Sequence, residues 1–401
     1  MKESPSVPLH LHIISMHTSP LAQPGSGDAG GMNVYIERSL SALLEINPQL
    51  TVEVFTLARS PQQAGRVQYH DRATVTALFI PEADGAARAD LPDLVPGFAL
   101  ALKAVAERPP QLIHAHYWLS GLAALAAYPQ VPLVQTMHTT AAVKNTRLGE
   151  GESPEPEVRV RGEQALVDRA VALVVNTSSE AQQMRDFYGA RNEQLVTVTP
   201  GVDRSVFHPS PYRRPRHIGH NRAAYLVFAG RPQPLKGPQL LVEALALLPE
   251  DLSITLAIAG SSATGYEQGL LARAQELGFG HRVQLLPSMT PQQLAQTFQR
   301  ADLVACPSSS ETFGLVALEA AACGTPVLAS RVDGLREAVA DGVTGVLVAE
   351  RTARAWADAI EALVRDPDAR ARLGAAGAAR AARFTWQATA RKLNALYLRS
   401  L

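Results

Sequence analysis

The chain has 401 residues, which is enough for two or three domains with full hydrophobic cores. Its 37 Lys and Arg residues balance its 37 Asp and Glu residues, so it lacks the basic excess of proteins that bind nucleic acid through bulk charge. With 46% apolar residues, 18% charged residues and two cysteines, the composition excludes a disordered chain and a disulfide scaffold and favours a folded protein of a reducing, cytoplasmic compartment.

Membrane insertion is not expected. The N-terminus has no apolar core of signal-peptide length before the first motif. The stretch from Pro109 to Val143 contains no Asp, Glu, Lys or Arg, but its longest apolar run is about eight residues, far below the ~20 of a spanning helix. Buried parallel strands and a core helix explain this stretch better.

The first half of the chain alternates short apolar runs with helical patterns, which predicts a parallel sheet covered by helices on both faces. We expect this half to form one domain, residues 1–207. The predicted strands are His12–Ser15, Val52–Leu57, Val75–Ile80, Leu112–His116, Leu133–Thr136, Ala172–Asn176 and Leu195–Val198. The predicted helices are Val34–Ile46, Phe98–Ala106, Glu157–Asp168 and Glu180–Tyr188.

A second series of the same kind follows a polar, proline-containing linker at His208–Arg222. It predicts a second domain, residues 208–380, and a C-terminal helix, residues 381–401, that packs back on the first domain. The fold class is therefore α/β, with two doubly wound, Rossmann-like domains facing a central cleft. The predicted strands are Leu226–Ala229, Ile254–Ala259, Val283–Leu285, Leu303–Cys306, Val327–Ala329 and Gly345–Val348, and the helices are Pro238–Leu248, Tyr266–Leu277, Pro291–Gln299 and Leu315–Ala322.

The first chemical signal is a glycine-rich loop after the first strand. Gly25, Gly27 and Gly30 match G-x-G-x-x-G, but nine residues separate Ser15 from Gly25, whereas a dinucleotide fingerprint follows its strand directly. A P-loop is excluded because no Gly-Lys-Ser/Thr follows. What remains is a loop with free backbone amides that opens a helix near Asn33, a place suited to an anion. An ordinary surface loop is the alternative.

Two further signals lie in the second half. Arg231 and Lys236 follow a predicted strand end, where two cations can hold a diphosphate; two solvated surface cations are the alternative. Glu311 precedes a predicted helix, and Glu319 lies on that helix among apolar neighbours. Because a carboxylate on an apolar face needs a hydrogen-bonding partner, sugar or ribose hydroxyls are candidates, and a structural pair with an arginine is the alternative.

Taken together, these motifs resemble the retaining nucleotide-sugar glycosyltransferases of the GT-B fold, family four. The resembling blocks are HTSPLAQPGSGDAGGMNVYI, AHYWLSG, MHTTAAVKN, GRPQPLKGPQ and ETFGLVALEAAACGTPV, spread from residue 17 to about residue 350. Within the family, the closer resemblance is to the glycosyltransferases of mycothiol biosynthesis. These move N-acetylglucosamine from UDP-GlcNAc to 1D-myo-inositol 3-phosphate. The implied partners are thus a UDP-sugar donor and a phosphorylated polyol acceptor, without nucleic acid or stable membrane insertion.

The resemblance also implies residue roles. The implied acceptor-binding residues are His17, Asp28, Ala29, Gly30, Gly31, Met32, Asn33, Arg88, Tyr117, Thr139 and Arg159. The implied donor-binding residues are Gln23, Pro24, Gly31, Arg231, Lys236, Met289, Glu311, Thr312, Phe313, Gly314, Leu315 and Glu319. The implied catalytic residues are His138, Arg231, Lys236 and Glu311, although His138 has the alternative of a satisfied core histidine.

Retention in this fold is usually described as front-face attack in which a donor phosphate takes the acceptor proton. On that description no protein base and no metal are required for catalysis, because the protein contributes electrostatics and proximity. Asp366-Pro-Asp368 matches the letters of a metal-binding DxD motif, but its helical surroundings favour a turn or helix cap. A structural Mg²⁺ ion and a homodimer stay open.

Three departures from the family pattern concern substrate specificity: Arg88 replaces a lysine, Met289 replaces a polar or basic residue near the uracil, and the loop Gly260–Gly265 is short. A glycolipid mannosyltransferase is a rival, but the helix Val34–Ile46 lacks the basic face that docks on anionic membranes. A sucrose-phosphate-synthase-like activity is another. A dehydrogenase fits poorly, because it needs an acidic residue at the end of the second strand and Glu53 lies inside that strand. A non-catalytic binding protein fits least, because the residues implied for both substrates are present.

Overall fold

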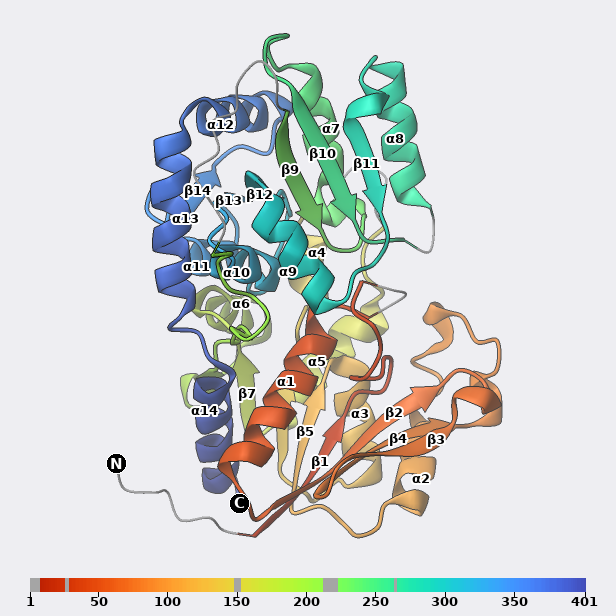
Figure 1. Ribbon diagram of the computed structural model, residues 1–401. Helices are drawn as coiled ribbons and strands as arrows, with labels where there is room; N and C mark the ends of the chain where they lie inside the picture. Colours follow the sequence, from red (N-terminus) through yellow and green to blue (C-terminus); the bar gives the residue numbers. More distant parts are fainter. Residues whose placement is uncertain (1–7, 26–28, 148–152, 212–222, 263–264) are drawn as a thin grey trace. The chain divides into compact units, whose positions relative to one another are not determined.

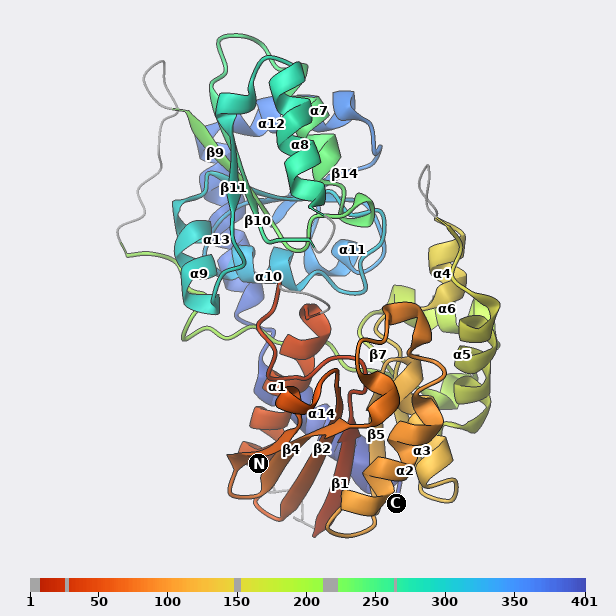
Figure 2. The same cartoon turned by 90° about the vertical axis from the view of Figure 1, so that its right-hand side faces the viewer.

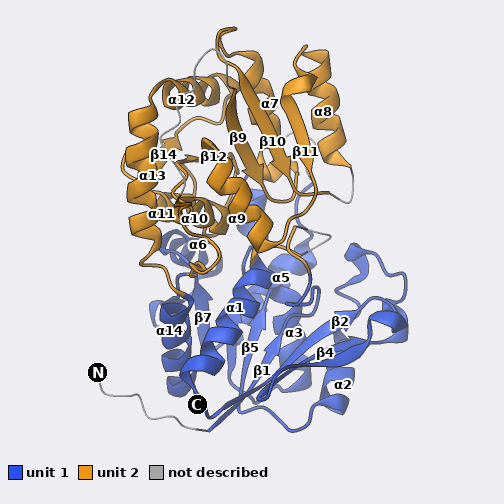
Figure 3. Cartoon of the chain, in the orientation of Figure 1, with its two compact units in different colours: residues 1–22, 32–199, 386–401 blue, residues 23–31, 200–385 orange. Residues whose placement is uncertain are grey.

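The computed structural model describes residues 8–25, 29–147, 153–211, 223–262 and 265–401. The chain divides into two compact units (Figure 3). Unit 1 comprises residues 1–22, 32–199 and 386–401, and unit 2 comprises residues 23–31 and 200–385. The chain passes between the two units at residues 199/200 and 385/386, whereas the sequence predicted domain boundaries at 207/208 and 380/381. The glycine-rich loop belongs to unit 2.

Unit 1 is built on an eight-stranded sheet in the order β3-β4-β2-β1-β5-β6-β7-β8. All neighbouring strands are parallel except β3 and β4. The strands are β1 (Leu9–Ile14), β2 (Leu50–Ala58), β3 (Gly65–His70), β4 (Ala73–Phe79), β5 (Leu112–His116), β6 (Leu133–Thr136), β7 (Ala172–Val175) and β8 (Leu195–Thr197).

Helices cover both faces of this sheet, with α1 and α14 on one side and α2 and α3 on the other (Figures 1 and 2). Strand β5 has side chains in contact with both helix layers. Ile113 and Ala115 belong to the apolar core beneath α2 and α3, and His114 between them forms a hydrogen bond with the Tyr397 hydroxyl of α14. The helices are α1 (Gly31–Ile46), α2 (Val95–Val105), α3 (Trp118–Ala127), α4 (Ala141–Asn145), α5 (Glu157–Arg169), α6 (Ser178–Tyr188) and α14 (Trp386–Arg399). Short 3-10 turns are η1 (Pro61–Gln63), η2 (Pro81–Ala83), η3 (Arg88–Asp90) and η4 (Asn192–Gln194).

Unit 2 is built on a six-stranded, fully parallel sheet in the order β11-β10-β9-β12-β13-β14, with an apolar core on each face. Its strands are β9 (Ala224–Ala229), β10 (Ile254–Ala259), β11 (Val283–Leu286), β12 (Leu303–Cys306), β13 (Val327–Ser330) and β14 (Gly345–Val348). Its helices are α7 (Pro238–Ala246), α8 (Tyr266–Glu276), α9 (Pro291–Arg300), α10 (Leu315–Ala322), α11 (Leu335–Ala338), α12 (Ala353–Arg365) and α13 (Pro367–Ala381), with 3-10 turns η5 (Pro234–Lys236) and η6 (Gly280–Arg282).

The predicted fold class is confirmed: both units are Rossmann-like α/β layers, and every predicted strand is present. Strand β3 was not predicted, because it is an exposed edge strand without an apolar run. The expected cap is also confirmed, since the Asp366 side chain accepts a hydrogen bond from the Ala369 amide at 2.8 Å at the start of α13. Within the described residues, no helix is long and apolar enough to cross a membrane. Part of the predicted linker, residues 212–222, lies outside the described residues.

Candidate functional site

In unit 2, a predicted cation and a predicted carboxylate lie side by side. Strand β9 ends at Ala229, and the segment after it carries Arg231 and then Lys236 on η5. Lys236 Nζ lies 2.6 Å from Glu311 Oε2. The Ser308 hydroxyl donates to the same oxygen at 3.4 Å. Residues 75 positions apart therefore meet at the carboxyl ends of β9 and β12, where ligands of parallel sheets bind.

A glycine makes this approach sterically possible. Gly237 follows Lys236 with a φ of 75°, in the left-handed region. A Cβ built there would lie 2.2 Å from the carbonyl oxygen of Pro307, so any other residue would push the segment away from the end of β12. The Lys236–Glu311 pair consequently depends on this backbone packing.

The predicted donor residues after Glu311 differ in what they can offer. Phe313 is buried in the core, with its ring centroid 5.9 Å from that of Phe384, so only its backbone could approach a ligand. Gly314 has a φ of 95° and leads into α10, whose first amides lack helical partners. Thr312 and Glu319 are half-buried. Leu315 is half-buried too and stands at the start of α10.

The glycine-rich loop makes contacts within unit 2. Gln23 Nε2 donates to the carbonyl oxygen of Met289 at 2.9 Å, and the Ser288 hydroxyl donates to the carbonyl oxygen of Gly25. The Gly25 amide donates to the carbonyl oxygen of Ala29 at 3.0 Å. The structure thus joins two predicted donor residues, Gln23 and Met289.

The remaining predicted residues of this loop are placed as follows. Pro24 and Gly30 are half-buried. A Cβ on Gly31 would lie 3.5 Å from Leu315 of α10. Asp28 lies outside the described residues.

In unit 1, four predicted acceptor residues from separate segments converge. Arg159 Nη2 donates to the carbonyl oxygen and the hydroxyl of Thr139, at 2.9 and 3.1 Å. The Arg159 guanidinium carbon lies 4.9 Å from the centre of the Tyr117 ring. That ring in turn lies 4.3 Å from the ring of His17. A guanidinium, a hydroxyl and two aromatic rings are thereby gathered beside the carboxyl ends of β5 and β6.

The Arg159 side chain is 1% exposed and is held by two carboxylates. Its Nε donates to Glu163 at 2.7 Å, and its Nη1 lies 2.9 Å from Glu155. Glu163 is fully buried and also accepts from the Tyr188 hydroxyl and the Ala141 amide. The pKa of Arg159 is raised: burial alone would lower it, but Tyr117 and the two carboxylates outweigh burial. The guanidinium is therefore held by these contacts and is charged at neutral pH.

His138 follows β6 in a left-handed backbone conformation, with a φ of 59°. Its Nε2 lies 2.9 Å from Nδ1 of His116, the two rings stack at 5.2 Å, and the buried Tyr35 ring packs edge-on at 5.6 Å. Burial, with a smaller contribution from His17, lowers the pKa of His138 to about 3. The imidazole is thus neutral at pH 7, which makes it a weak general base and a potential hydrogen-bonding group.

The other predicted acceptor residues have separate places. Asn33 is buried and donates to the Thr18 hydroxyl and the Ser19 carbonyl oxygen, so it shapes the loop after β1. Met32 packs against the core of unit 1. Arg88 lies on the exposed turn η3, and its position beside the Arg159 group stays a prediction.

The residues that support Arg159 and His138 were not predicted from the sequence. Glu163 stands four residues after Arg159 on a predicted helix, and this i,i+4 spacing could have identified the ion pair. His116 ends a buried strand and gave no signal of its own. Glu155 and Lys144, which pair at 2.6 Å beside Arg159, come from segments whose proximity the sequence does not show.

Unit 2 therefore carries a Lys–Glu pair and the start of a helix near its strand ends, and unit 1 carries a buried arginine beside a hydroxyl. Both arrangements suit polar ligands. Two known families match parts of the chain. Residues 30–201 match the family described as "Glycosyl transferase 4-like domain", and residues 214–380 match "Glycosyl transferases group 1".

Relatives of known name match nearly the whole chain. The D-inositol 3-phosphate glycosyltransferase of Mycolicibacterium smegmatis is 44% identical, covering 98% of this chain and 92% of its own. The protein of the same name from Gordonia bronchialis is 42% identical, covering 98% and 89%.

Solved structures agree with the fold. Sucrose-phosphate synthase from Thermosynechococcus elongatus is 30% identical, with a TM-score of 0.89 over 98% of both chains. Anabaena HepE in complex with UDP-glucose, at 22% identity and a TM-score of 0.74 over 98% of this chain and 100% of its own, shares the fold. The chain belongs to the GT-B glycosyltransferases of the group 1 and 4-like families, which transfer a sugar from a nucleotide-sugar donor.

Proposed function

We propose that the protein is a retaining glycosyltransferase that transfers N-acetylglucosamine from UDP-GlcNAc to 1D-myo-inositol 3-phosphate. The relatives named D-inositol 3-phosphate glycosyltransferase support this acceptor. The observation that carries the proposal is the meeting of Tyr117, Thr139 and Arg159 from three separate segments. A phosphate monoester with nearly two negative charges suits a guanidinium and hydroxyls placed together.

On the donor side, Arg231 and Lys236 would hold the diphosphate, Glu319 the ribose hydroxyls, and Glu311 the transferred sugar. The 2.6 Å contact between Lys236 and Glu311 supports this division, because one cation can then orient the sugar-binding carboxylate and face the leaving diphosphate. A diphosphate that binds Lys236 would cost Glu311 little stabilisation, because both side chains of this ion pair are partly exposed to solvent.

In the proposed reaction, the bond between the anomeric carbon and the UDP phosphate oxygen breaks as the inositol oxygen bonds to the same face. The inositol hydroxyl proton passes to the departing phosphate oxygen, so UDP leaves protonated and the configuration is retained. His138 contributes as a neutral hydrogen-bonding group, because its lowered pKa removes it as a base. Positioning and stabilisation of UDP supply the catalysis.

The acceptor phosphate would compete with Glu155 for Arg159. Glu155 lies 2.9 Å from Nη1 and is 24% exposed, whereas Glu163 holds Nε and is fully buried. We therefore expect phosphate to displace Glu155 and leave Glu163 in place. Lys144, at 2.6 Å from Glu155, would keep the displaced carboxylate paired.

The test compares UDP release from UDP-GlcNAc with inositol 3-phosphate and with unphosphorylated myo-inositol as acceptors. Thr139→Val removes the hydroxyl but keeps the carbonyl oxygen that accepts from Arg159. Because a hydrogen bond to a charged group contributes roughly 1.5–3 kcal/mol, kcat/KM for the phosphorylated acceptor should fall ~10- to 150-fold. Activity with myo-inositol should be low and unchanged by the substitution. Equal losses with both acceptors would contradict phosphate binding at Thr139.

A sucrose-phosphate-synthase-like activity is the second candidate, favoured by the 30% identity and TM-score of 0.89 to sucrose-phosphate synthase. Such an enzyme also uses a phosphorylated acceptor, so the same group at Arg159 would serve it. UDP-glucose with a phosphorylated ketose belongs in the same assay. Faster UDP release with that pair than with UDP-GlcNAc and inositol 3-phosphate would favour this candidate.

We further propose a cytoplasmic enzyme whose transfer step needs no metal ion. Cys306 and Cys323 are buried and form no disulfide bond, which fits a reducing compartment. Turnover at 25 °C should be unchanged by a chelator. A loss of turnover that Mg²⁺ restores would contradict the metal-free step.

A further inference from the structure

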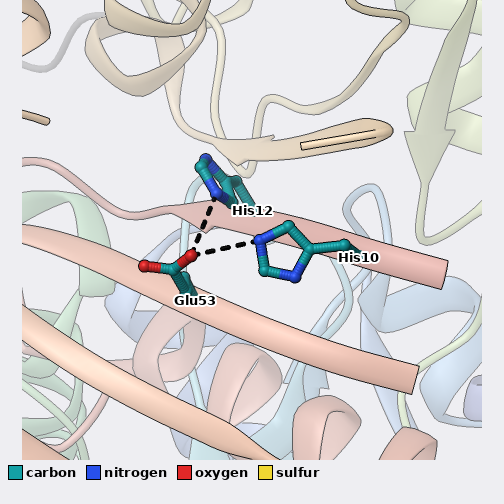
Figure 4. A group of neighbouring side chains, drawn as sticks. All are labelled: His10, His12 and Glu53. Carbon is teal, nitrogen blue, oxygen red and sulfur yellow. Dashed lines mark hydrogen bonds and ion pairs between the residues drawn. The ribbon is translucent and has the colours of Figure 1, made fainter. Parts of the chain in front are cut away.

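Two histidines and a glutamate form a buried cluster in unit 1, apart from the residues assigned to either substrate. His10 and His12 are two residues apart on β1, so their side chains face the same side of the sheet. Glu53 is the residue of β2 that pairs with His12 (Figure 4). The exposed fractions are 5% for His10, 0% for His12 and 3% for Glu53. The cluster sits beneath the loop between α2 and β5, at residues 106–111, where Glu107 and Arg108 contact it.

The geometry of the three ligand atoms suits a metal ion. Glu53 Oε1 lies 3.1 Å from Nε2 of His10 and 3.5 Å from Nε2 of His12. A tetrahedral zinc ion with bonds of about 2.0–2.1 Å holds its ligand atoms about 3.3–3.4 Å apart. Each of the three residues offers one ligand atom, and these atoms lie within 4.8 Å of one another.

Two of the three residues, Glu53 and His10, are oriented by hydrogen bonds on the side away from the cluster, as metal ligands commonly are. Glu53 Oε2, which faces away from the histidines, accepts from the Glu107 amide at 3.1 Å. His10 Nδ1 lies 3.0 Å from the Thr51 hydroxyl, which also accepts from Arg108 at 2.5 Å. With the proton on Nδ1 donated to Thr51, the Nε2 lone pair of His10 is directed at the Glu53 carboxylate, and a cation can bind both; with the proton on Nε2, His10 donates to Glu53 instead.

His12 supplies an independent observation. Its ring is completely buried against the rings of His10, Phe55 and Tyr128. Within the described part of the chain, neither ring nitrogen makes a hydrogen bond of normal geometry, and its polar neighbours are the backbone of Arg108 and the Glu53 carboxylate at 3.5 Å. A buried polar group without a hydrogen bond costs free energy, which coordination to a metal would remove.

We propose that His10, His12 and Glu53 bind one divalent transition-metal ion of the zinc type and that this ion fastens β1 to β2. Two imidazoles and one carboxylate are a common protein ligand set for Zn²⁺, and a water molecule completes it. The strand ends that carry His17 and the Arg159 group lie at the opposite end of the sheet, because the strands are parallel and His10 stands near the start of β1. The site is therefore structural and separate from the transfer reaction.

The direct test is metal binding by the full-length chain without an affinity tag. Protein stripped with a chelator should bind one equivalent of Zn²⁺ by mass spectrometry of the metal, and Co²⁺ should give the intense visible absorption of a four-coordinate site. Zn²⁺ at about 100 times its Kd should raise Tm by about 5–10 °C if unit 1 unfolds as one transition. No stoichiometric binding and no cobalt band would overturn the proposal.

Variants locate the site. His12→Phe keeps an aromatic ring against Phe55 but removes a ligand, and Glu53→Gln keeps the shape but removes the charge. Each should weaken Zn²⁺ binding by at least about 100-fold, because even loss of a supporting residue costs 10- to 100-fold. His70→Gln, on the exposed edge strand β3, is the matched control and should bind as the parent protein does. Undiminished binding by His12→Phe would overturn the site, and the cobalt spectrum of the parent protein decides the matter should a variant fail to fold.

Discussion

Replacing Arg159 by alanine should destabilise unit 1 by about 3–5 kcal/mol, the usual cost of leaving a buried charge without its partner. The structure favours the lower end of that range. Glu163 would keep its hydrogen bonds from Tyr188 and Ala141, and Glu155 is 24% exposed and would keep Lys144. Loss of the guanidinium over Tyr117 adds a smaller cost.

For a unit of this size, 3 kcal/mol corresponds to a fall in Tm of about 6–12 °C. Urea unfolding followed by circular dichroism measures the change. Arg161→Ala, two residues along the same helix, is the control, because its ion pair with Glu157 is largely exposed and its loss should cost less than about 0.5 kcal/mol. Adding Glu163→Gln to Arg159→Ala removes the orphaned charge and should recover part of the loss.

A buried ion pair between Arg159 and Glu163 would be refuted if Arg159→Ala cost no more stability than Arg161→Ala, or if the effects of changing Arg159 and Glu163 simply added. The result also bears on function. Because Arg159→Ala perturbs stability as well as the acceptor group, Thr139→Val is the cleaner probe of phosphate binding.

The remaining predictions concern the donor site and acid stability. Lys236→Ala should lower kcat by ~10²–10³ while Tm stays within about 2 °C, because the pair with Glu311 is partly exposed; near-parental turnover in steady-state kinetics would contradict it. Glu319→Gln should raise the donor KM more than it lowers kcat, whereas Glu311→Gln should mainly lower kcat; identical kinetic changes in the two would rule out separate roles. Burial is the main cause that lowers the pKa of His114 and His138 to about 3, so below about pH 6.5 the unfolded chain binds protons that the folded chain does not. Stability should then fall by about 1.4 kcal/mol per pH unit for each such histidine between pH 6.5 and 3, and a Tm that is constant from pH 7 to pH 5 would contradict this.

The fold could be predicted from the sequence because its strands are short apolar runs buried on both faces. The runs Leu112–His116, Ile254–Ala259 and Leu303–Cys306 match the observed strands residue for residue. Strand β3 escaped prediction because an exposed edge strand needs no apolar pattern. Domain boundaries are harder, since the glycine-rich loop at residues 23–31 belongs to unit 2 although the chain on both sides of it belongs to unit 1.

The candidate site was predictable in its residue types but not in its contacts. Family resemblance pointed to Tyr117, Thr139 and Arg159. The carboxylates that hold the arginine, Glu155 and Glu163, were missed although each lies four residues from it, a spacing that favours ion pairs. The left-handed conformations of Tyr117 and His138 are rare for residues other than glycine and leave no sequence signal. The His10–Glu53 contact was missed for a related reason, since strand register emerges only from the folded sheet.

The measurement that tests the central claim most directly is the rate of UDP release from UDP-GlcNAc with 1D-myo-inositol 3-phosphate, set against the same assay with unphosphorylated myo-inositol and with no acceptor. The proposed function predicts rapid release only with the phosphorylated acceptor and a product whose mass equals that of inositol phosphate plus one N-acetylglucosamine unit. Release at the same rate with all three, or no release with any, would contradict it.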